Sequence, residues 1–259
     1  MPAEHAPRAA VLFALREEAA PFLRRLVIPK TVPLDARRIT RACGALRDRA
    51  VCIACSGAGE RNAEEGIRLL SQAQDSPFSC LLICGFAGGL AAEMAPGSLL
   101  VAERVTVHGD KASPEVYPAD SRLLALANSV GLPGIDLRRG ALHTTNRILI
   151  SPAEKKALAE RTGAQAVDME TAGAARAAAA RNIPWLAVRA ITDAADQEMP
   201  FDFNRLADMD GNVDRSRVIL AVLTHPWKIP ALIRLGTNSA CAARNLASFV
   251  EAFLGLLPD

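Results

Sequence analysis

Four continuous apolar stretches constrain this chain most, because a segment without a polar face has to be buried on both sides. They lie at residues 10–14, 51–55, 80–84 and 185–191. Runs of this length are typical of strands in a parallel sheet covered by helices on each face. Between them, apolar residues recur at three- and four-residue spacing, which predicts helices over 17–26, 61–70, 120–129, 152–161 and 169–181. The alternation predicts a three-layer α/β fold.

The middle and the end of the chain follow other patterns. Residues 98–107 and 138–143 alternate between apolar and polar, so we expect them to curl the sheet or to form antiparallel strands around it. No linker or repeat divides the chain, and we treat residues 8–255 as one domain, with 213–255 a C-terminal helical extension packed on it. A final helix is predicted from Ser239. One face of it carries a stripe that docks on the core or, as the alternative, contacts a partner or lipid: Leu246, Phe249, Val250 and Phe253.

Charge and hydropathy exclude several classes of protein. The 259 residues include 30 basic and 28 acidic ones, a formal net charge of +2, so no field that attracts polyanions is expected and nucleic acid is not a predicted partner. The longest apolar stretch, residues 81–102, contains Glu93 and Pro96 and therefore does not predict a membrane span. The apolar residues 9–15 are too few for a signal sequence. These features predict a soluble, cytoplasmic protein.

The cysteines are expected to be reduced thiols. Most of them lie inside apolar runs, where a free cysteine packs as a small hydrophobic residue. Cys52 and Cys55 have the C-x-x-C spacing, but no second pair and no set of histidines accompanies them, so neither a metal site nor redox use is predicted. The six are Cys43, Cys52, Cys55, Cys80, Cys84 and Cys241.

Small residues follow two of the predicted strands, at the sheet edge where open α/β sheets bind ligands. Phe86, Ala87 and Gly88 belong to a glycine-rich segment whose backbone a ligand can approach closely. This signal is weak by itself. The segment does not match G-x-G-x-x-G, which argues against a nicotinamide-dependent dehydrogenase.

A second turn has the features of an anion site. Ser56 and Gly57 precede a predicted helix whose first turn contains Arg61. A hydroxyl, a helix N-terminus and an arginine together suit phosphate, so inorganic phosphate is a candidate co-substrate. A tight turn with a capping serine explains the same residues equally well.

Two acidic residues are the strongest candidates for chemistry. Asp193 emerges directly from an apolar strand, where burial favours the neutral, proton-holding form of its carboxyl group and suits a proton donor. An N-cap or a salt bridge to Arg189 is the structural alternative. Glu170 follows Met169 at a helix start, where a carboxylate can hold sugar hydroxyls beside a cationic transition state. A helix-dipole-stabilised acid with Asp168 as the cap fits as well.

The end of the first strand adds further candidates. Glu18 is placed to activate water, and a solvated first-turn acid is the alternative. Arg16 is a candidate for holding an anionic nucleophile, although an arginine at a helix start is usually solvated. His108 and His143 lack a motif and are interpreted as structural.

Together these segments resemble the superfamily of purine nucleoside phosphorylases and methylthioadenosine/S-adenosylhomocysteine nucleosidases. The order and spacing agree over roughly residues 9–205. The resemblance implies a three-layer αβα sandwich around a mixed, partly barrel-like sheet, and cleavage of a nucleoside N-glycosidic bond without metal or organic cofactor. It also implies a homo-oligomer. The resembling segments are Ala14 to Glu18, Ser56 to Gly59, Gly85 to Leu90, Val167 to Glu170 and Arg189 to Asp196.

The resemblance assigns roles to individual residues. It implies that Asp193 protonates purine N7, that Met169 and Glu170 contact ribose, and that Glu18 activates water. It further implies that the backbone of Phe86, Ala87 and Gly88 lines the site and that Ile148 touches the base. Phe86 departs from the family, which has Ser or Thr there, and so does the segment from Phe201 to Asn204.

Within this superfamily, the residues leave the substrate and the nucleophile open. Glu18 favours hydrolysis, whereas Arg16, Arg61 and the Ser56 turn favour phosphorolysis. The segments 199–203 and 225–235 resemble hopanoid-associated phosphorylases, which implies a 5′-modified adenosine such as adenosylhopane and a tail with peripheral lipid contact. The alternative function is a nucleoside-binding module without turnover.

Overall fold

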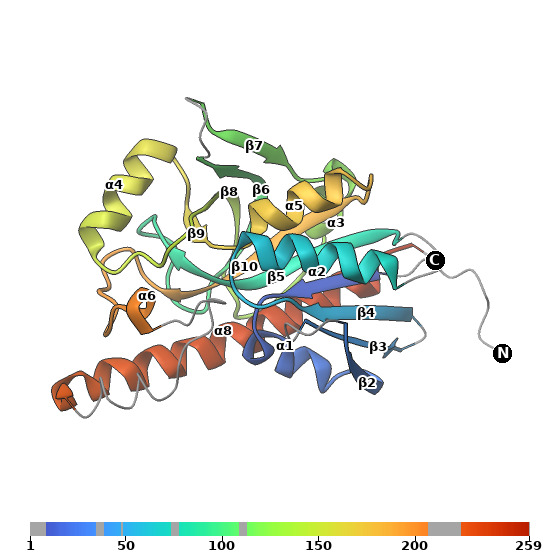
Figure 1. Ribbon diagram of the computed structural model, residues 1–259, viewed down its shortest axis with the longest axis horizontal. Coiled ribbons are helices and arrows are strands. Elements are labelled where there is room, and N and C mark those ends of the chain that lie inside the picture. The colour runs from blue at the N-terminus through green and yellow to red at the C-terminus, as the bar shows by residue number, and fades with distance from the viewer. Residues whose placement is uncertain are drawn as a thin grey trace.

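The computed structural model describes residues 9–34, 39–47, 49–73, 78–108, 113–206 and 224–258. Ten strands of these residues form one sheet, and helices lie on both of its faces (Figure 1). The strands are β1 (Ala9–Phe13), β2 (Val27–Pro33), β3 (Thr40–Leu46), β4 (Arg49–Cys55), β5 (Cys80–Gly89), β6 (Leu99–Val107), β7 (Glu115–Pro118), β8 (Leu137–Thr144), β9 (Ala166–Asp168) and β10 (Trp185–Asp193). The helices are α1 (Arg16–Leu23), α2 (Glu60–Gln72), α3 (Ser121–Ala127), α4 (Pro152–Thr162), α5 (Thr171–Ala179), α6 (Phe203–Leu206) and α8 (Ile229–Leu256), with a 3-10 turn at Pro226–Lys228.

The centre of the sheet is parallel, as the apolar runs predict. β1 lies between β4 and β5, and β5 also pairs with β10, all in the same direction. The order continues from β10 through β6, β8 and β9 back to β5, so these five strands close into a ring. β6 runs antiparallel to β10 and parallel to β8. The closure confirms the expected curl of the sheet around residues 98–107 and 138–143.

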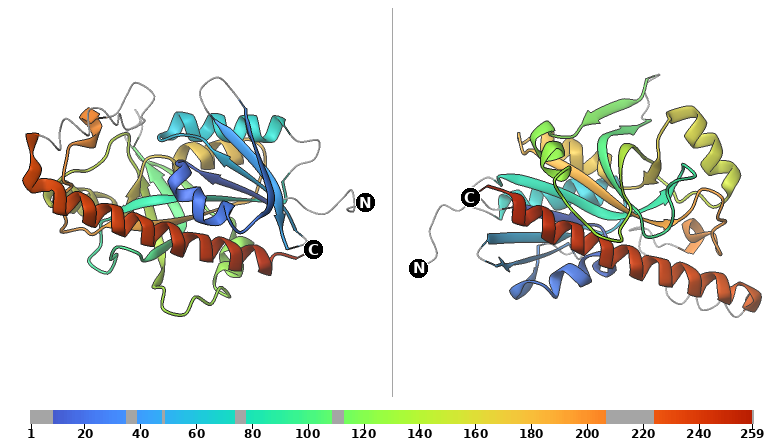
Figure 2. Two further views of the ribbon diagram at one scale, coloured as in Figure 1. Left: turned by 90° about the horizontal axis from the view of Figure 1, so that it is seen from below. Right: turned by 180° about the vertical axis from the view of Figure 1, so that it is seen from behind.

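Two helical layers cover the sheet because successive side chains of a buried strand point to opposite faces. In β5, Leu82 and Cys84 pack with residues of α1, α3 and α8, whereas Leu81 and Ile83 pack with α2 and α5. Figures 1 and 2 show α8 running along one face and its first turns projecting beyond the sheet. The three-layer sandwich around a mixed, partly barrel-like sheet is therefore confirmed.

The ends of two helices differ from the predictions. α5 begins at Thr171 and not at Met169, because the Asp168 side chain accepts a hydrogen bond from the Thr171 backbone N–H at 3.0 Å. α8 begins at Ile229, ten residues before the predicted start at Ser239. The prolines that suggested an interruption lie in the 3-10 turn and at the first turn of α8, where a missing N–H costs little. Of the predicted extension 213–255, residues 213–223 lie outside the described residues.

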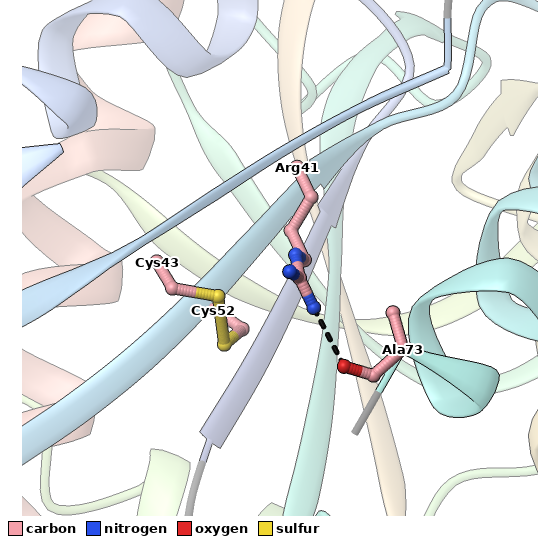
Figure 3. Close-up of a disulfide and its surroundings, with 4 residues drawn as sticks. All are labelled: Arg41, Cys43, Cys52 and Ala73. Carbon is pink, nitrogen blue, oxygen red and sulfur yellow. Dashed lines mark hydrogen bonds between the residues drawn. A yellow bond between two sulfur atoms is a disulfide. The ribbon is translucent and has the colours of Figure 1, made fainter. Parts of the chain in front are cut away.

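The cysteine prediction is wrong for one pair. Cys43 and Cys52 form a disulfide between β3 and β4, with their Cα atoms 4.3 Å apart (Figure 3). They face each other directly in the antiparallel register, which brings their sulfur atoms together. Nearby, Arg41 of β3 donates a hydrogen bond to the Ala73 carbonyl at the end of α2. Cys55, Cys80, Cys84 and Cys241 are free.

Within the described ranges, none of the helices is both long enough and apolar enough to span a membrane.

Candidate active site

A cavity of about 990 Å³ lies where the carboxyl ends of β1, β5 and β10 meet. This volume is at the upper end of the range for small-molecule sites. The structure brings together all of the predicted catalytic and substrate-binding residues, since each of them lines the cavity. They are Glu18, Phe86, Ala87, Gly88, Ile148, Met169, Glu170 and Asp193.

Buried charge is concentrated at this cavity. Burying an ionised side chain is costly unless it is paired, so such residues are rare in a protein interior. In the described part of the chain, every buried Asp, Glu, Lys or Arg either lines the cavity or pairs with a residue that does. The set is Glu18, Lys155, Asp168, Glu170, Arg189 and Asp193.

Glu18 lies in the first turn of α1 and is 2% exposed, so it is not the solvated acid of the alternative interpretation. Its carboxylate accepts hydrogen bonds from the backbone N–H groups of Ala14 (3.0 Å), Leu15 (2.8 Å) and Phe86 (2.8 Å). Burial raises the pKa of Glu18, while the Arg189 charge and these three hydrogen bonds oppose the rise. The backbone at the ends of β1 and β5 thus holds the Glu18 carboxylate at the cavity wall, and burial makes this carboxylate a stronger base.

Glu170 is the N-cap residue of α5. One of its oxygens accepts a hydrogen bond from the Gly59 backbone N–H at 3.0 Å, and the other lies 3.5 Å from Arg189 Nη1. The pKa of Glu170 is raised to about 7, chiefly by burial; the charges of Asp168 and Glu18 contribute to the rise, and that of Arg189 opposes it. Met169, the preceding residue, lines the cavity beside it. Both predicted ribose contacts are therefore on one wall.

Arg189 holds the side chains behind this wall through ion pairs and hydrogen bonds. It is 1% exposed, pairs with Asp168 at 2.5 Å and donates to Thr171 Oγ1 at 2.7 Å. Gly85 stands opposite Arg189 on β5, and a Cβ there would lie 2.2 Å from Arg189 Nη1, so this position needs glycine. The alternative prediction of an Arg189–Asp193 salt bridge is wrong, because Arg189 pairs with Asp168 and Glu170. These two acids neutralise the charge of Arg189.

Asp193 ends β10 and pairs with another residue, Lys155 of α4. The distance from Lys155 Nζ to Asp193 Oδ2 is 2.5 Å, and Asp193 Oδ1 accepts from Thr192 Oγ1 at 2.7 Å. The sequence predicts a buried, proton-holding acid at this position, with an N-cap or a salt bridge to Arg189 as the alternative. The structure corrects that expectation by giving Asp193 a buried cationic partner.

The opposite part of the cavity is formed by backbone and small residues. A Cβ on Gly88 would lie 3.1 Å from Asp193 Oδ2, so glycine keeps the strand end close to this carboxylate. Ile148 is half-buried. Its backbone forms two hydrogen bonds with the Asn204 side chain, at 2.8 and 2.9 Å, which connect the segment before α4 to α6.

The four residues predicted to bind phosphate do not line the cavity. Ser56 is buried and its hydroxyl donates to the Gly57 carbonyl at 3.0 Å, as a turn-stabilising serine does. Arg16 and Arg61 are exposed. In this turn only Ala58 reaches the cavity wall.

Neither the histidines nor any other side chains form a metal site in the described ranges. His143 is buried, its Nδ1 lies 2.8 Å from Thr106 Oγ1, and its ring is 5.1 Å from that of His108. Burial lowers the pKa of His143 to about 4, and the nearby charge of His108 lowers it further. Both histidines fit the structural role that we predict for them.

The sequence analysis missed several residues of the site. Lys155 is one of two adjacent lysines, and only the register of α4 shows that Lys155 points inward while Lys156 is exposed. Met199, Phe203 and Asn204 also line the cavity, the last two from α6, and the sequence analysis named their segments without giving these residues a role. The one available signal was Arg189, a charge inside an apolar strand, which required buried acidic partners.

Comparisons with known proteins agree with this arrangement. Residues 8–224 match a family model described as the Phosphorylase superfamily. A 5′-methylthioadenosine/S-adenosylhomocysteine nucleosidase of Mycobacterium bovis is 27% identical over 257 residues, covering 82% of this chain and 95% of that protein. The protein of the same name from Oceanobacillus iheyensis is 28% identical over 183 residues, covering 65% and 79%.

Solved structures share the fold at lower identity. A Helicobacter pylori 5′-methylthioadenosine/S-adenosylhomocysteine nucleosidase superposes with a TM-score of 0.77 at 20% identity, covering 98% of this chain and all of that one. The futalosine hydrolase of Helicobacter pylori gives a TM-score of 0.76 at 21% identity, covering 97% and 99%.

Proposed function

We propose that this chain, which belongs to the Phosphorylase superfamily, cleaves the N-glycosidic bond of purine nucleosides. The observation that carries the proposal is the cavity in which the carboxyl groups of Glu18, Glu170 and Asp193 all line the wall. Breaking this bond needs a proton for the departing base, stabilisation of a ribosyl cation and a nucleophile. The three carboxyl groups match these three needs. The nucleosidases that resemble the chain support the same reaction.

Each residue has a role that follows from its surroundings. Asp193, with its cationic partner Lys155, delivers the proton to the purine. Glu170 accepts hydrogen bonds from ribose hydroxyls, and these strengthen as the sugar becomes positive. Met169 packs against the ribose, while Ile148 and the backbone of residues 86–88 contact the base.

Water is the nucleophile that the surroundings of the cavity favour. Glu18 is buried and positioned by three backbone N–H groups, and burial raises its pKa, which makes it a stronger base than an exposed glutamate. A phosphate ion would need several donors or cations facing the cavity. Lys155 lines the cavity, but its ammonium donates to Asp193 and to two backbone carbonyls, and Arg147 pairs with Glu154 at 2.7 Å. We therefore propose hydrolysis.

The substrate is a 5′-modified adenosine with an apolar substituent, such as methylthioadenosine or, as the larger candidate, adenosylhopane. The cavity is lined on one side by Met199 and Phe203. From Phe203 a series of ring contacts leads through Phe201 and His225 to Trp227, which is 70% exposed. In this proposal a long apolar substituent leaves the cavity beside Phe203 and packs against this row of rings.

A panel of nucleosides tests the proposal. Methylthioadenosine, adenosine and adenosylhopane are incubated with the protein, with and without phosphate, and adenine is measured by chromatography. We expect adenine release at a rate that phosphate does not change. Release that depends on phosphate would refute hydrolysis, and exclusive turnover of methylthioadenosine would refute the lipid substrate.

The alternative, a nucleoside-binding module, is tested with Asp193→Asn. An enzyme should lose about 10²- to 10⁴-fold in turnover while still binding the nucleoside, because general acid catalysis contributes that much. If the wild-type protein binds nucleosides and releases no adenine from any of them, the binding module is correct.

A further inference from the structure

The amino group of Lys155 has an unusual environment. The residue is 1% exposed and projects from α4 to the end of β10. Its Nζ donates to Asp193 Oδ2 at 2.5 Å and to the backbone carbonyls of Ala194 at 2.6 Å and Gln197 at 3.0 Å. The two carbonyls can only accept, and the carboxyl group of Asp193 can only accept when it is ionised.

This geometry defines the protonation state of the pair. An ammonium group has three N–H donors for these three oxygens, and an amine holds a proton far more tightly than a carboxylate does, so the shared proton belongs on Lys155. The described residues place only one acid, Asp193, within ion-pair distance of it. The carboxyl groups of Asp168 and Glu170 face Arg189, and Glu18 is held by backbone N–H groups. In the resting protein the pair is therefore an ammonium and a carboxylate.

A carboxylate at position 193 has no proton to give to a departing base. We propose that Lys155 is the source of this proton, an inference that rests on the proposed function of the site. As negative charge develops on the purine, Asp193 gives a proton to the base nitrogen and takes one from Lys155. One N–H bond of the ammonium breaks, one N–H bond on the purine forms, and Lys155 becomes a neutral amine. Solvent returns the proton after the products leave.

The choice of lysine agrees with this role. An arginine could neutralise Asp193 equally well, but its guanidinium does not give up a proton in proteins, whereas a buried lysine does so readily. The position on α4 also matters, because the same amino group holds the turn that contains Ala194 and Gln197 against the helix. The proton source is thus fixed relative to the base-binding end of the cavity.

Three variants test the proposal through the pH dependence of adenine release from methylthioadenosine. Lys155→Met removes the proton source, and Lys155→Arg keeps the charge without a transferable proton. Lys156→Met is the matched control, because this neighbour is 78% exposed and lies 3.9 Å from Glu160. Thermal melting and binding of an uncleaved nucleoside analogue report whether each variant is folded.

We expect turnover by Lys155→Met to fall about 10²-fold or more near pH 8. Relative to wild type at the same pH, it should recover as the pH is lowered toward 5, because Asp193 without its cation can take a proton from solvent. Lys155→Arg should stay impaired near pH 8, and Lys156→Met should match wild type. A difference between the pH profiles of a Lys155 variant and wild type reports the supply of the proton, because the variant retains the other ionisable groups that line the cavity beside Asp193. These are Glu17, Glu18, Arg147, Asp168 and Glu170.

Chemical rescue covers the case in which the arginine does not fit. Lys155→Ala leaves a space at the cavity wall, and we expect propylammonium to restore turnover there while tetramethylammonium, which has no N–H, does not. Full activity of Lys155→Arg, rescue by both ions, or a loss in Lys155→Met that is equal at all pH values would overturn the inference. If wild type releases no adenine from any nucleoside, the proposed function itself is wrong. If wild type is active and the variants give one of these results, only the inference about Lys155 is wrong.

Discussion

Replacing Asp168 by asparagine tests how strongly the ribose wall depends on its buried ion pair. The Asp168 side chain is 0% exposed and that of Arg189 is 1% exposed. Besides Arg189, the carboxylate accepts hydrogen bonds from Thr144 Oγ1 at 2.7 Å and from the backbone N–H and hydroxyl of Thr171. Asparagine has almost the same shape but no charge, and its amide nitrogen has to face one of these donors.

The size of the effect follows from this burial. Arg189 would keep only Glu170, 3.5 Å away, and Glu170 is itself needed at the cavity. Removing one partner of a buried pair costs about 3–5 kcal/mol, because the other charge is left uncompensated. Since domains are stable by about 5–15 kcal/mol, this variant should lose a large part of its free energy of unfolding.

A matched substitution at the surface is the control. Asp136 pairs with Arg138 at 2.9 Å, with both side chains almost half exposed, and such pairs contribute about 0–1 kcal/mol. Urea unfolding of Asp168→Asn and Asp136→Asn gives the two losses directly. Equal losses would refute the reasoning that the buried pair organises this wall.

Three further predictions concern pH, helix packing and lipid. Because burial raises the pKa of Glu170 from 4.5 to about 7, the folded chain binds this proton more tightly than the unfolded chain does. The free energy of unfolding should therefore fall as the pH rises through this window, and an unchanged slope in Glu170→Gln would contradict the assignment. Gly173→Ala should cost about 1–3 kcal/mol, because its Cβ would lie 2.3 Å from the Glu60 carbonyl, whereas Gly236→Ala, with open space in α8, should gain about 1 kcal/mol in urea unfolding. Trp227 and Ile233 are 70% and 64% exposed beside Lys228 and Arg234, so we expect α8 to bind anionic vesicles in sedimentation assays and Ile233→Ser to weaken that binding; equal binding would exclude this surface.

The sequence predicted those parts of the fold that local pattern determines. The strands β1, β4, β5 and β10 consist mainly of apolar residues because both faces of the sheet are covered, and this signal can be recognised without knowing which strands pair. The candidate acids followed from their positions at strand and helix ends. Pairing across the sheet is different, because the Cys43–Cys52 disulfide depends on the register of β3 and β4. Lys155 and the partners of Arg189 likewise depend on which elements meet in space.

The charges of the site suggest how it distinguishes a transition state from a substrate. Four buried carboxyl groups, those of Glu18, Asp168, Glu170 and Asp193, face two buried cations among the described residues, Lys155 and Arg189. Burial raises the pKa values of Glu18 and Glu170, so both carboxyl groups lose their protons less readily than exposed glutamates do.

A ribosyl cation would supply the missing positive charge and favour ionised carboxylates, so the site should bind it more tightly than a neutral nucleoside. We therefore expect a nucleoside analogue with a protonated amine in its sugar ring to bind more tightly than the neutral ribose compound of the same size. The difference should shrink in Glu170→Gln, because that variant removes one of the buried negative charges beside the sugar. Calorimetry with both ligands measures it, and equal affinities for wild type would show that the excess negative charge does not act on the sugar.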